Sequence, residues 1–140
     1  MLGGEFKHVV DSKNRIFIPA AFRAELGGTF VVTRSIRGNF LCFYSRQSWE
    51  EYVAPLKKAP RSASEDILRF LYRTVAEVTP DAQGRILLPQ VLVDYAGISK
   101  QAYVIGVGDY GEIWSEAAYA EKTENENVLS MRQTLEQLGL

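Results

Sequence analysis

Residues 11–19 read Asp-Ser-Lys-Asn-Arg-Ile-Phe-Ile-Pro, and the pattern returns at residues 81–89 as Asp-Ala-Gln-Gly-Arg-Ile-Leu-Leu-Pro. Aspartate, arginine, isoleucine and proline all recur after 70 positions, from 11 to 81. A fixed displacement of this kind indicates an internal repeat, in which each copy is one small structural unit. The match continues beyond the motif, where the corresponding pairs are Phe22 and Leu92, Gly27 and Gly97, and Ser45 and Ser115.

Each copy is predicted to form a strand, a turn, a short strand, a short helix, a hairpin and a helix. Asn14 and Gly84 stand where a tight turn requires left-handed backbone angles, which glycine adopts freely and asparagine tolerates. A proline before each short helix and a glycine after it mark its start and its stop. The expected extended segments are 6–10 and 74–79, the short strands 15–18 and 85–88, and the hairpins 29–34 with 40–44 and 103–107 with 112–114.

Helices are expected between and after the copies. Ser45 and Ser115 are candidate N-caps. An apolar stripe at helical spacing follows Ser45, and Pro55 is expected to disturb its last turn. The connector is predicted at 57–61, followed by a capping box of Ser62 and Glu65 that opens a helix over 63–73. The tail, residues 128–138, is a plausible amphipathic helix.

Composition limits the possible classes of protein. The chain has 140 residues, of which 46% are hydrophobic and 24% charged, as in globular domains. Cys42 and His8 are the only residues of their kinds, so we expect no disulfide framework, no metal site and no cofactor. No apolar run approaches the roughly 20 residues of a spanning helix, and the first residues do not resemble a signal peptide. We therefore expect a cytoplasmic protein without a membrane partner.

The net charge of −1 conceals an uneven distribution. Residues 1–46 carry seven basic and three acidic side chains, a net of +4, whereas residues 81–140 carry four and nine, a net of −5. The intervening residues 47–80 balance at five against five. The N-terminal part is therefore the better candidate for contact with phosphates, although an ordinary solvated surface explains the charge equally well.

The repeated motif admits two kinds of chemistry. Asp11 and Asp81 precede tight turns, and we expect them to accept hydrogen bonds from turn N–H groups rather than to act as acids or bases. Arg15 and Arg85 could form structural ion pairs, or they could present their guanidinium groups to phosphates and guanine edges. The residues alone leave these two alternatives open.

With the doubled motif and the hairpin and helix after each copy, the chain resembles the MraZ family, whose members contain tandem SpoVT/AbrB-like domains. The resemblance covers residues 4–119 and, more loosely, the rest of the chain. It implies a β-rich α+β fold in which two swapped-hairpin half-barrels form one pseudo-two-fold unit with flanking helices. It also implies a nucleoid-associated transcriptional regulator, usually a repressor, that assembles into a ring. Its partner would be double-stranded DNA carrying repeated sites upstream of the division and cell-wall gene cluster.

Carried over by position, the resemblance implies that Arg15 and Arg85 contact DNA and that Lys13 is the basic residue of the first motif. The second motif departs from the pattern with Gln83, and the first departs with Asn14, where the family usually has glycine. These departures and the charge asymmetry lead us to expect that the first copy contributes more to binding than the second. Secondary candidates for phosphate contact are Lys7, Arg23 and Arg34.

The resulting division of the chain is residues 5–47 for the first domain, 48–75 for a helical connector, 76–119 for the second domain and 120–140 for a helical tail. Residues 106–111 match G-x-G-x-x-G, but we interpret them as a hairpin turn because a strand rather than a helix is expected to follow. The alternatives are a ring-forming interaction protein that does not bind DNA, an antitoxin-type regulator, and a small enzyme using Asp11 or Asp81. No pocket motif or metal set supports the enzyme.

Overall fold

The two copies of the repeat fold into the same succession of elements. The computed structural model describes all 140 residues. In the first copy the elements are β1 (Leu2–Val9), β2 (Arg15–Phe17), α1 (Ala20–Leu26), β3 (Phe30–Arg34), β4 (Leu41–Tyr44) and α2 (Arg46–Lys58). After α3 (Arg61–Arg73), the second copy contributes β5 (Ala76–Val78), β6 (Arg85–Leu87), α4 (Gln90–Ala96), β7 (Gln101–Gly108), β8 (Gly111–Ser115) and α5 (Glu116–Glu124), and α6 (Val128–Gln137) ends the chain. This is a β-rich α+β fold, as the sequence predicts.

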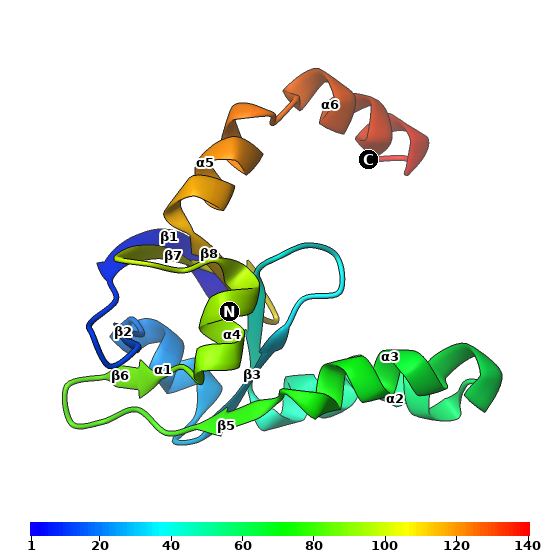
Figure 1. Cartoon of the computed structure of the whole chain (residues 1–140). Coiled ribbons are helices and arrows are strands. Elements are labelled where there is room, and N and C mark those ends of the chain that lie inside the picture. The colour runs from blue at the N-terminus through cyan, green and yellow to red at the C-terminus, as the bar shows by residue number, and fades with distance from the viewer.

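Strands of the two copies alternate in a shared sheet. Its order is β1-β7-β8-β4-β3-β5, and β2 and β6 form a separate two-stranded ribbon. The first strand of each copy pairs antiparallel with the hairpin of the other copy, β1 with β7 and β5 with β3. Read from either end, the sheet presents corresponding strands in the same order, so the two copies are related by an approximate two-fold axis. Figure 1 shows β1 beside β7 and β5 beside β3.

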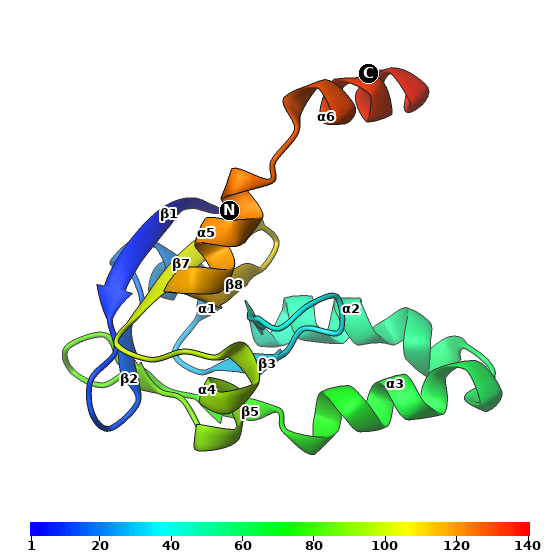
Figure 2. The same cartoon turned by 45° about the horizontal axis from the view of Figure 1, so that its top comes forward.

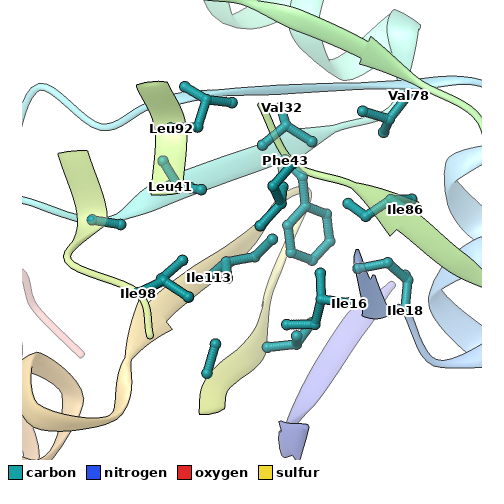
Figure 3. Close-up of a cluster of buried hydrophobic side chains, with 14 of the residues drawn as sticks. Ile16, Ile18, Val32, Leu41, Phe43, Val78, Ile86, Leu92, Ile98 and Ile113 are labelled. Atoms are coloured by element: carbon teal, nitrogen blue, oxygen red, sulfur yellow. The ribbon is translucent and has the colours of Figure 1, made fainter. Parts of the chain in front are cut away.

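The main core lies between the sheet and the ribbon and belongs to both copies. Ile16 and Ile86 face each other across the ribbon with no exposed surface, and Phe43 and Ile113 from the sheet are buried as completely (Figure 3). Segments of about 70 residues bury a smaller share of their apolar surface than larger domains do, so each copy would be only marginally stable alone. Interleaving the strands solves this problem because each copy completes the other's core.

A second apolar cluster holds the helical hairpin α2–α3 against strands β3 and β4. Trp49 and Val53 of α2 and Leu71 of α3 are buried there, while the far ends of the two helices extend away from the sheet (Figure 2). The predicted helix N-caps are confirmed, because Ser45 Oγ accepts from Ser48 N and Ser115 Oγ accepts from Ala118 N, both at 3.1 Å.

Three predictions about this hairpin are wrong. Helix α2 continues through Pro55 to Lys58, because Pro55 lies on the exposed face while Val53 and Leu56 beside it pack on the apolar cluster. Helix α3 begins at Arg61 after the extended Pro60, so Ser62 lies inside the first turn and caps nothing. The connector is consequently only Ala59–Pro60 rather than 57–61.

Helices α5 and α6 follow the last strand and lead away from the sheet (Figures 1 and 2). Helix α6 buries none of its residues, although it is rich in large apolar side chains. None of the six helices combines the length and the apolar character that crossing a membrane requires. The glycine-rich segment 106–111 forms the β7–β8 hairpin, with Gly106 opposite Gly111, so the prediction of a turn in place of a dinucleotide site is confirmed.

Candidate nucleic-acid interface

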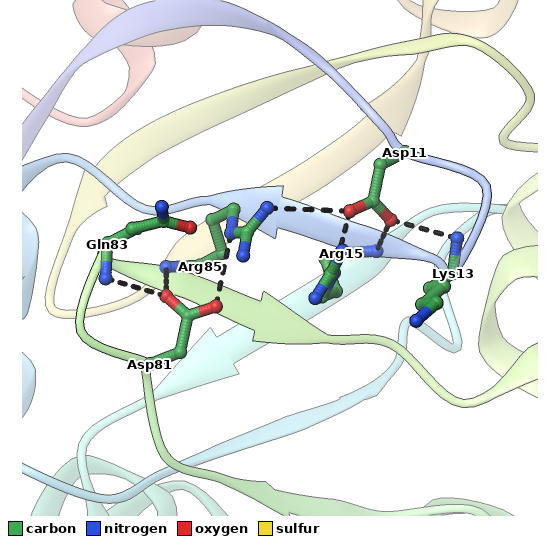
Figure 4. Close-up of polar contacts among 6 residues, drawn as sticks. All are labelled: Asp11, Lys13, Arg15, Asp81, Gln83 and Arg85. Carbon is green, nitrogen blue, oxygen red and sulfur yellow. Dashed lines mark hydrogen bonds and ion pairs between the residues drawn. The ribbon is translucent and has the colours of Figure 1, made fainter.

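The two copies of the motif lie side by side on the β2–β6 ribbon (Figure 4). Arg15 is opposite Leu87 and Arg85 is opposite Phe17, so the approximate two-fold axis passes through the pair Ile16 and Ile86. Cross-strand bonds from Ile18 N to Gly84 O and from Leu88 N to Asn14 O continue the ribbon to both turns. The buried Ile16 and Ile86 anchor the ribbon to the core. The two turns, with Arg15 and Arg85, remain on the outer side of the ribbon.

Each aspartate of the motif organises its own turn. Asp11 Oδ1 accepts hydrogen bonds from the backbone N–H groups of Lys13 and Arg15, both at 2.9 Å. Asp81 Oδ1 accepts the corresponding bonds from Gln83 and Arg85 at 2.9 and 3.0 Å. The hydrogen bond from the backbone N–H of Arg15 or Arg85 is the main reason that the pKa of the corresponding aspartate lies below its usual value. Both carboxylates are therefore ionised at neutral pH and serve to shape the turns.

The second oxygen of each aspartate fixes the arginine. Asp11 Oδ2 is 2.6 Å from Arg15 Nε, and Asp81 Oδ2 is 3.1 Å from Arg85 Nε. Arg85 Nη1 also lies 3.6 Å from Asp11 Oδ2, so the two motifs share one continuous polar surface (Figure 4). The side chains of Arg15 and Arg85 are 34% and 31% exposed. Because Nε is held, the plane of each guanidinium is set before any ligand arrives, which lowers the entropy lost on binding.

The turn residues Asn14 and Gly84 both have left-handed backbone angles, with φ of 60° and 80°. Their surroundings differ between the copies. Asn14 Nδ2 donates to Gln90 Oε1 at 2.8 Å, and Gln90 Nε2 donates to Asp94 at 2.8 Å. Sequence reasoning missed Gln90; its only signal is that it opens the helix after Pro89, where the first copy has Ala20.

The other basic candidates occupy different environments. Lys13 is exposed in the first turn. Lys7 lies on β1 and forms an ion pair with Glu116, and the hydrogen bond in this pair raises the pKa of the lysine. Arg23 of α1 lies against the second turn, where its Nε donates to Ile18 O at 3.0 Å. The structure therefore brings Lys13 and Arg23 to the ribbon and leaves Lys7 neutralised on the sheet.

The structure corrects the assignment of Arg34 as a phosphate contact. This side chain is only 8% exposed, its guanidinium carbon lies 3.7 Å from the centre of the Phe70 ring, and its Nη2 donates to Phe70 O at 2.7 Å. Helix α3 covers the strand that carries Arg34, so this arginine secures the helical hairpin instead of facing solvent. The sequence contains no signal for this covering, because the docking position of α3 depends on tertiary packing.

No group of three or more histidine, cysteine, aspartate or glutamate side chains is arranged to hold a metal ion. The only thiol, Cys42, is buried on β4, and its removal from water raises its pKa to about 12. The polar chemistry on the outer side of the ribbon thus consists of guanidinium and ammonium groups arranged around two turn carboxylates.

Comparison with known proteins agrees with this arrangement. A family described as "MraZ protein, putative antitoxin-like" matches residues 1–69 and again residues 71–138, one match for each copy. Relatives named transcriptional regulator MraZ include that of Caldicellulosiruptor bescii, 44% identical over 144 residues and covering 100% of both chains. Those of Acetivibrio thermocellus and Clostridium acetobutylicum are each 37% identical and also cover 100% of both chains. These are names of regulators and not of enzymes, and the chain belongs to the MraZ family.

Proposed function

We propose that this protein regulates transcription by binding double-stranded DNA through the outer side of the β2–β6 ribbon. The observation that carries the proposal is the pair of guanidinium groups of Arg15 and Arg85, displayed on one surface with each Nε held by a turn aspartate. A planar fork of donors in a fixed orientation suits phosphates and the O6 and N7 atoms of guanine.

The shape of the ribbon supports the same proposal. A two-stranded antiparallel ribbon fits the major groove of B-form DNA, where each base pair presents a distinct pattern of donors and acceptors. Ile16 and Ile86 hold the ribbon on the core, so the arginines are carried by a rigid element and not by a free loop. In this proposal Arg15 and Arg85 read the DNA, and the exposed Lys13 adds a phosphate contact beside Arg15.

The interleaved strands support an AbrB-like swapped-hairpin barrel as the unit that binds. The pairing of β1 with β7 and of β5 with β3 is what an exchange of first strands between two hairpins produces. We accordingly keep residues 5–47 and 76–119 as the two interleaved domains, 48–75 as the helical connector and 120–140 as the tail. A single chain then presents both motifs to one duplex.

Assembly of several chains would compensate for the small footprint of each one. A chain that neutralises few phosphates binds modestly, but linking chains gives later contacts an effective concentration on the order of mM, which raises avidity by roughly 10²–10⁴. The proposed form is a homo-oligomeric ring that binds repeated promoter sites. It would act in the cytoplasm, at the nucleoid, as a repressor of the division and cell-wall gene cluster.

Helix α6 supports the assembly part of this proposal. Val128, Met131 and Leu135 of α6 and the C-cap residue Leu138 are all at least 47% exposed, and their spacing of three, four and three residues is that of a coiled-coil seam. Such a seam is complementary to a second copy of itself. Removing residues 126–140 should lower the oligomeric mass measured by light scattering, and an unchanged mass would exclude α6 from the assembly.

Electrophoretic mobility shift with a fragment carrying tandem promoter repeats tests DNA binding directly. Losing one bidentate contact to a guanine costs about 1–3 kcal/mol, so Arg15→Ala should weaken specific binding by roughly 5- to 150-fold for each bound chain. The matched control is Arg69→Ala, because Arg69 is exposed and paired with carboxylates but lies on α3, away from the ribbon.

The outcomes separate the candidate functions. Near-wild-type affinity of Arg15→Ala, with the oligomer intact, would contradict the assigned interface. If the wild-type protein retained no DNA at physiological salt but still assembled, a ring-forming interaction scaffold would be the better interpretation. In that case Arg15 and Arg85 would act as interface ion pairs.

A further inference from the structure

The two turns of the ribbon carry unequal charge in the sequence. The first turn contains Lys13 and Arg15 beside Asp11, which sums to +1. The second contains Arg85 beside Asp81, which sums to zero because Gln83 stands where the first motif has Lys13. On this count the second motif would attract a phosphate backbone less than the first.

Arg23 changes this balance although it belongs to the first copy. Its guanidinium lies directly on Gly84 of the second turn: a Cβ atom placed on Gly84 would be 2.9 Å from Arg23 Cζ. The side chain is positioned by the bond from its Nε to Ile18 O and by the Phe17 ring, whose centre is 5.6 Å from Arg23 Cζ. That hydrogen bond is the only one that the Arg23 side chain forms within the chain, so its Nη groups are free to contact a ligand.

The first turn has no equivalent arrangement. The counterpart of Arg23 after 70 positions is Val93, which is buried in the core. At the first turn the Asn14 side chain is bonded to Gln90 instead. The absence of a side chain at Gly84 leaves room for a guanidinium from the other copy at the second turn, whereas Val93 supplies no cation to the first.

We propose that Arg23 supplies the cation that the second motif lacks at Gln83, so that each turn presents two cations around one carboxylate. With Arg23 included, the charge at the second turn sums to +1, equal to the first. The two motifs then contribute comparably to phosphate binding, in place of the dominance of the first copy that the sequence suggests. This inference rests on the proposed DNA binding, and it assigns Arg23 to a contact with the DNA phosphate backbone beside the second motif.

The salt dependence of DNA binding tests the inference. Each phosphate contact contributes about 0.9 to the slope of log K against log salt concentration. Arg23→Gln should therefore reduce the magnitude of the slope by about 0.9 per bound chain, and Arg23→Lys, which keeps the charge, should leave it near the wild-type value. Adding Gln83→Lys to Arg23→Gln should restore the slope, because the missing cation is then supplied at the turn itself.

A purely structural role for Arg23 gives a different result. Loss of its packing on Phe17 would weaken binding and lower the midpoint of urea denaturation without changing the slope, and Gln83→Lys would not rescue it. An unchanged slope in Arg23→Gln, or a failed rescue in a folded double variant, would overturn the inference. If the wild-type protein bound no DNA, both the proposed function and this inference would fail. If Arg15→Ala lost binding as expected but Arg23→Gln had no effect, only this inference would fail. Arg69→Gln is the matched control for the loss of an exposed arginine.

Discussion

Replacing Gly84 by alanine should destabilise the protein more than replacing the equivalent Asn14 by glycine. Gly84 has φ of +80°, a conformation that costs an L-residue about 1–2 kcal/mol. The added Cβ would also lie 2.9 Å from both Phe17 Cε2 and Arg23 Cζ. The arginine can move aside, but the Phe17 ring packs edge-on against His8, with ring centres 5.1 Å apart, and retreat would disturb that contact.

Overpacking of this kind typically costs about 1–3 kcal/mol. The alanine recovers about 0.4–1 kcal/mol by restricting the unfolded chain. The net loss for Gly84→Ala is therefore about 1–5 kcal/mol in the free energy of unfolding. Asn14→Gly relieves about 1 kcal/mol of backbone strain, but it loses the exposed bond to Gln90 and makes the unfolded chain more flexible. These two losses are about 1 kcal/mol each, so a net loss of about 1 kcal/mol is expected.

Urea denaturation at one fixed protein concentration measures both variants, since assembly makes stability depend on concentration. Linear extrapolation with unchanged m-values would give the two free energies of unfolding. A loss below about 0.5 kcal/mol for Gly84→Ala would refute the reasoning, because neither the backbone strain nor the contact with Phe17 could then be present.

Three further predictions concern other parts of the molecule. Arg34→Met should lower the free energy of unfolding by about 1–3 kcal/mol, because Phe70 O loses its hydrogen-bond donor. The salt dependence of DNA binding should stay unchanged, and a smaller slope of log K against log salt concentration would indicate that Arg34 contacts DNA after all. Ser45→Ala should cost about 1 kcal/mol through loss of the helix N-cap, measured by thermal unfolding, and no change in midpoint would contradict the cap. The pKa values of Asp11 and Asp81 are lowered on folding, so their stabilisation is complete above the ordinary aspartate pKa of about 4 and disappears as pH falls below it. Acid unfolding of Asp11→Asn should therefore show a weaker pH dependence below pH 4 than the wild type, and an identical profile would exclude this contribution.

Much of the fold is predictable from local patterns. The proline before each short helix, the glycine after it and the two serine N-caps mark element boundaries through backbone chemistry alone, and the structure confirms them. The Asp-to-Arg spacing similarly predicts the turn, because an aspartate before a tight turn can reach the N–H groups of the residues that follow. Errors occur where packing outweighs a local preference, as at Pro55, where buried neighbours keep α2 helical beyond a residue that disfavours helix.

The candidate site is only partly predictable for the same reason. The motif arginines are found by repetition, since both copies preserve them at one spacing. The different environments of Arg23 and Arg34 cannot be predicted in this way, because both are basic residues in the basic N-terminal third of the chain. Arg23 lies on a turn 61 residues away in the chain, and Arg34 lies beneath a helix whose docking surface no local pattern describes.

The sequence alone therefore determined the duplication, the succession of elements in each copy, the turn chemistry and the motif arginines, since these depend on residues close together in the chain. Only the tertiary structure decided that the first strand of each copy pairs with the hairpin of the other, that the arginines of both motifs lie close together, and that Arg23 reaches the second turn. These features depend on which distant surfaces must cover each other to exclude water, and that free energy is a property of the assembled core, not of any local segment.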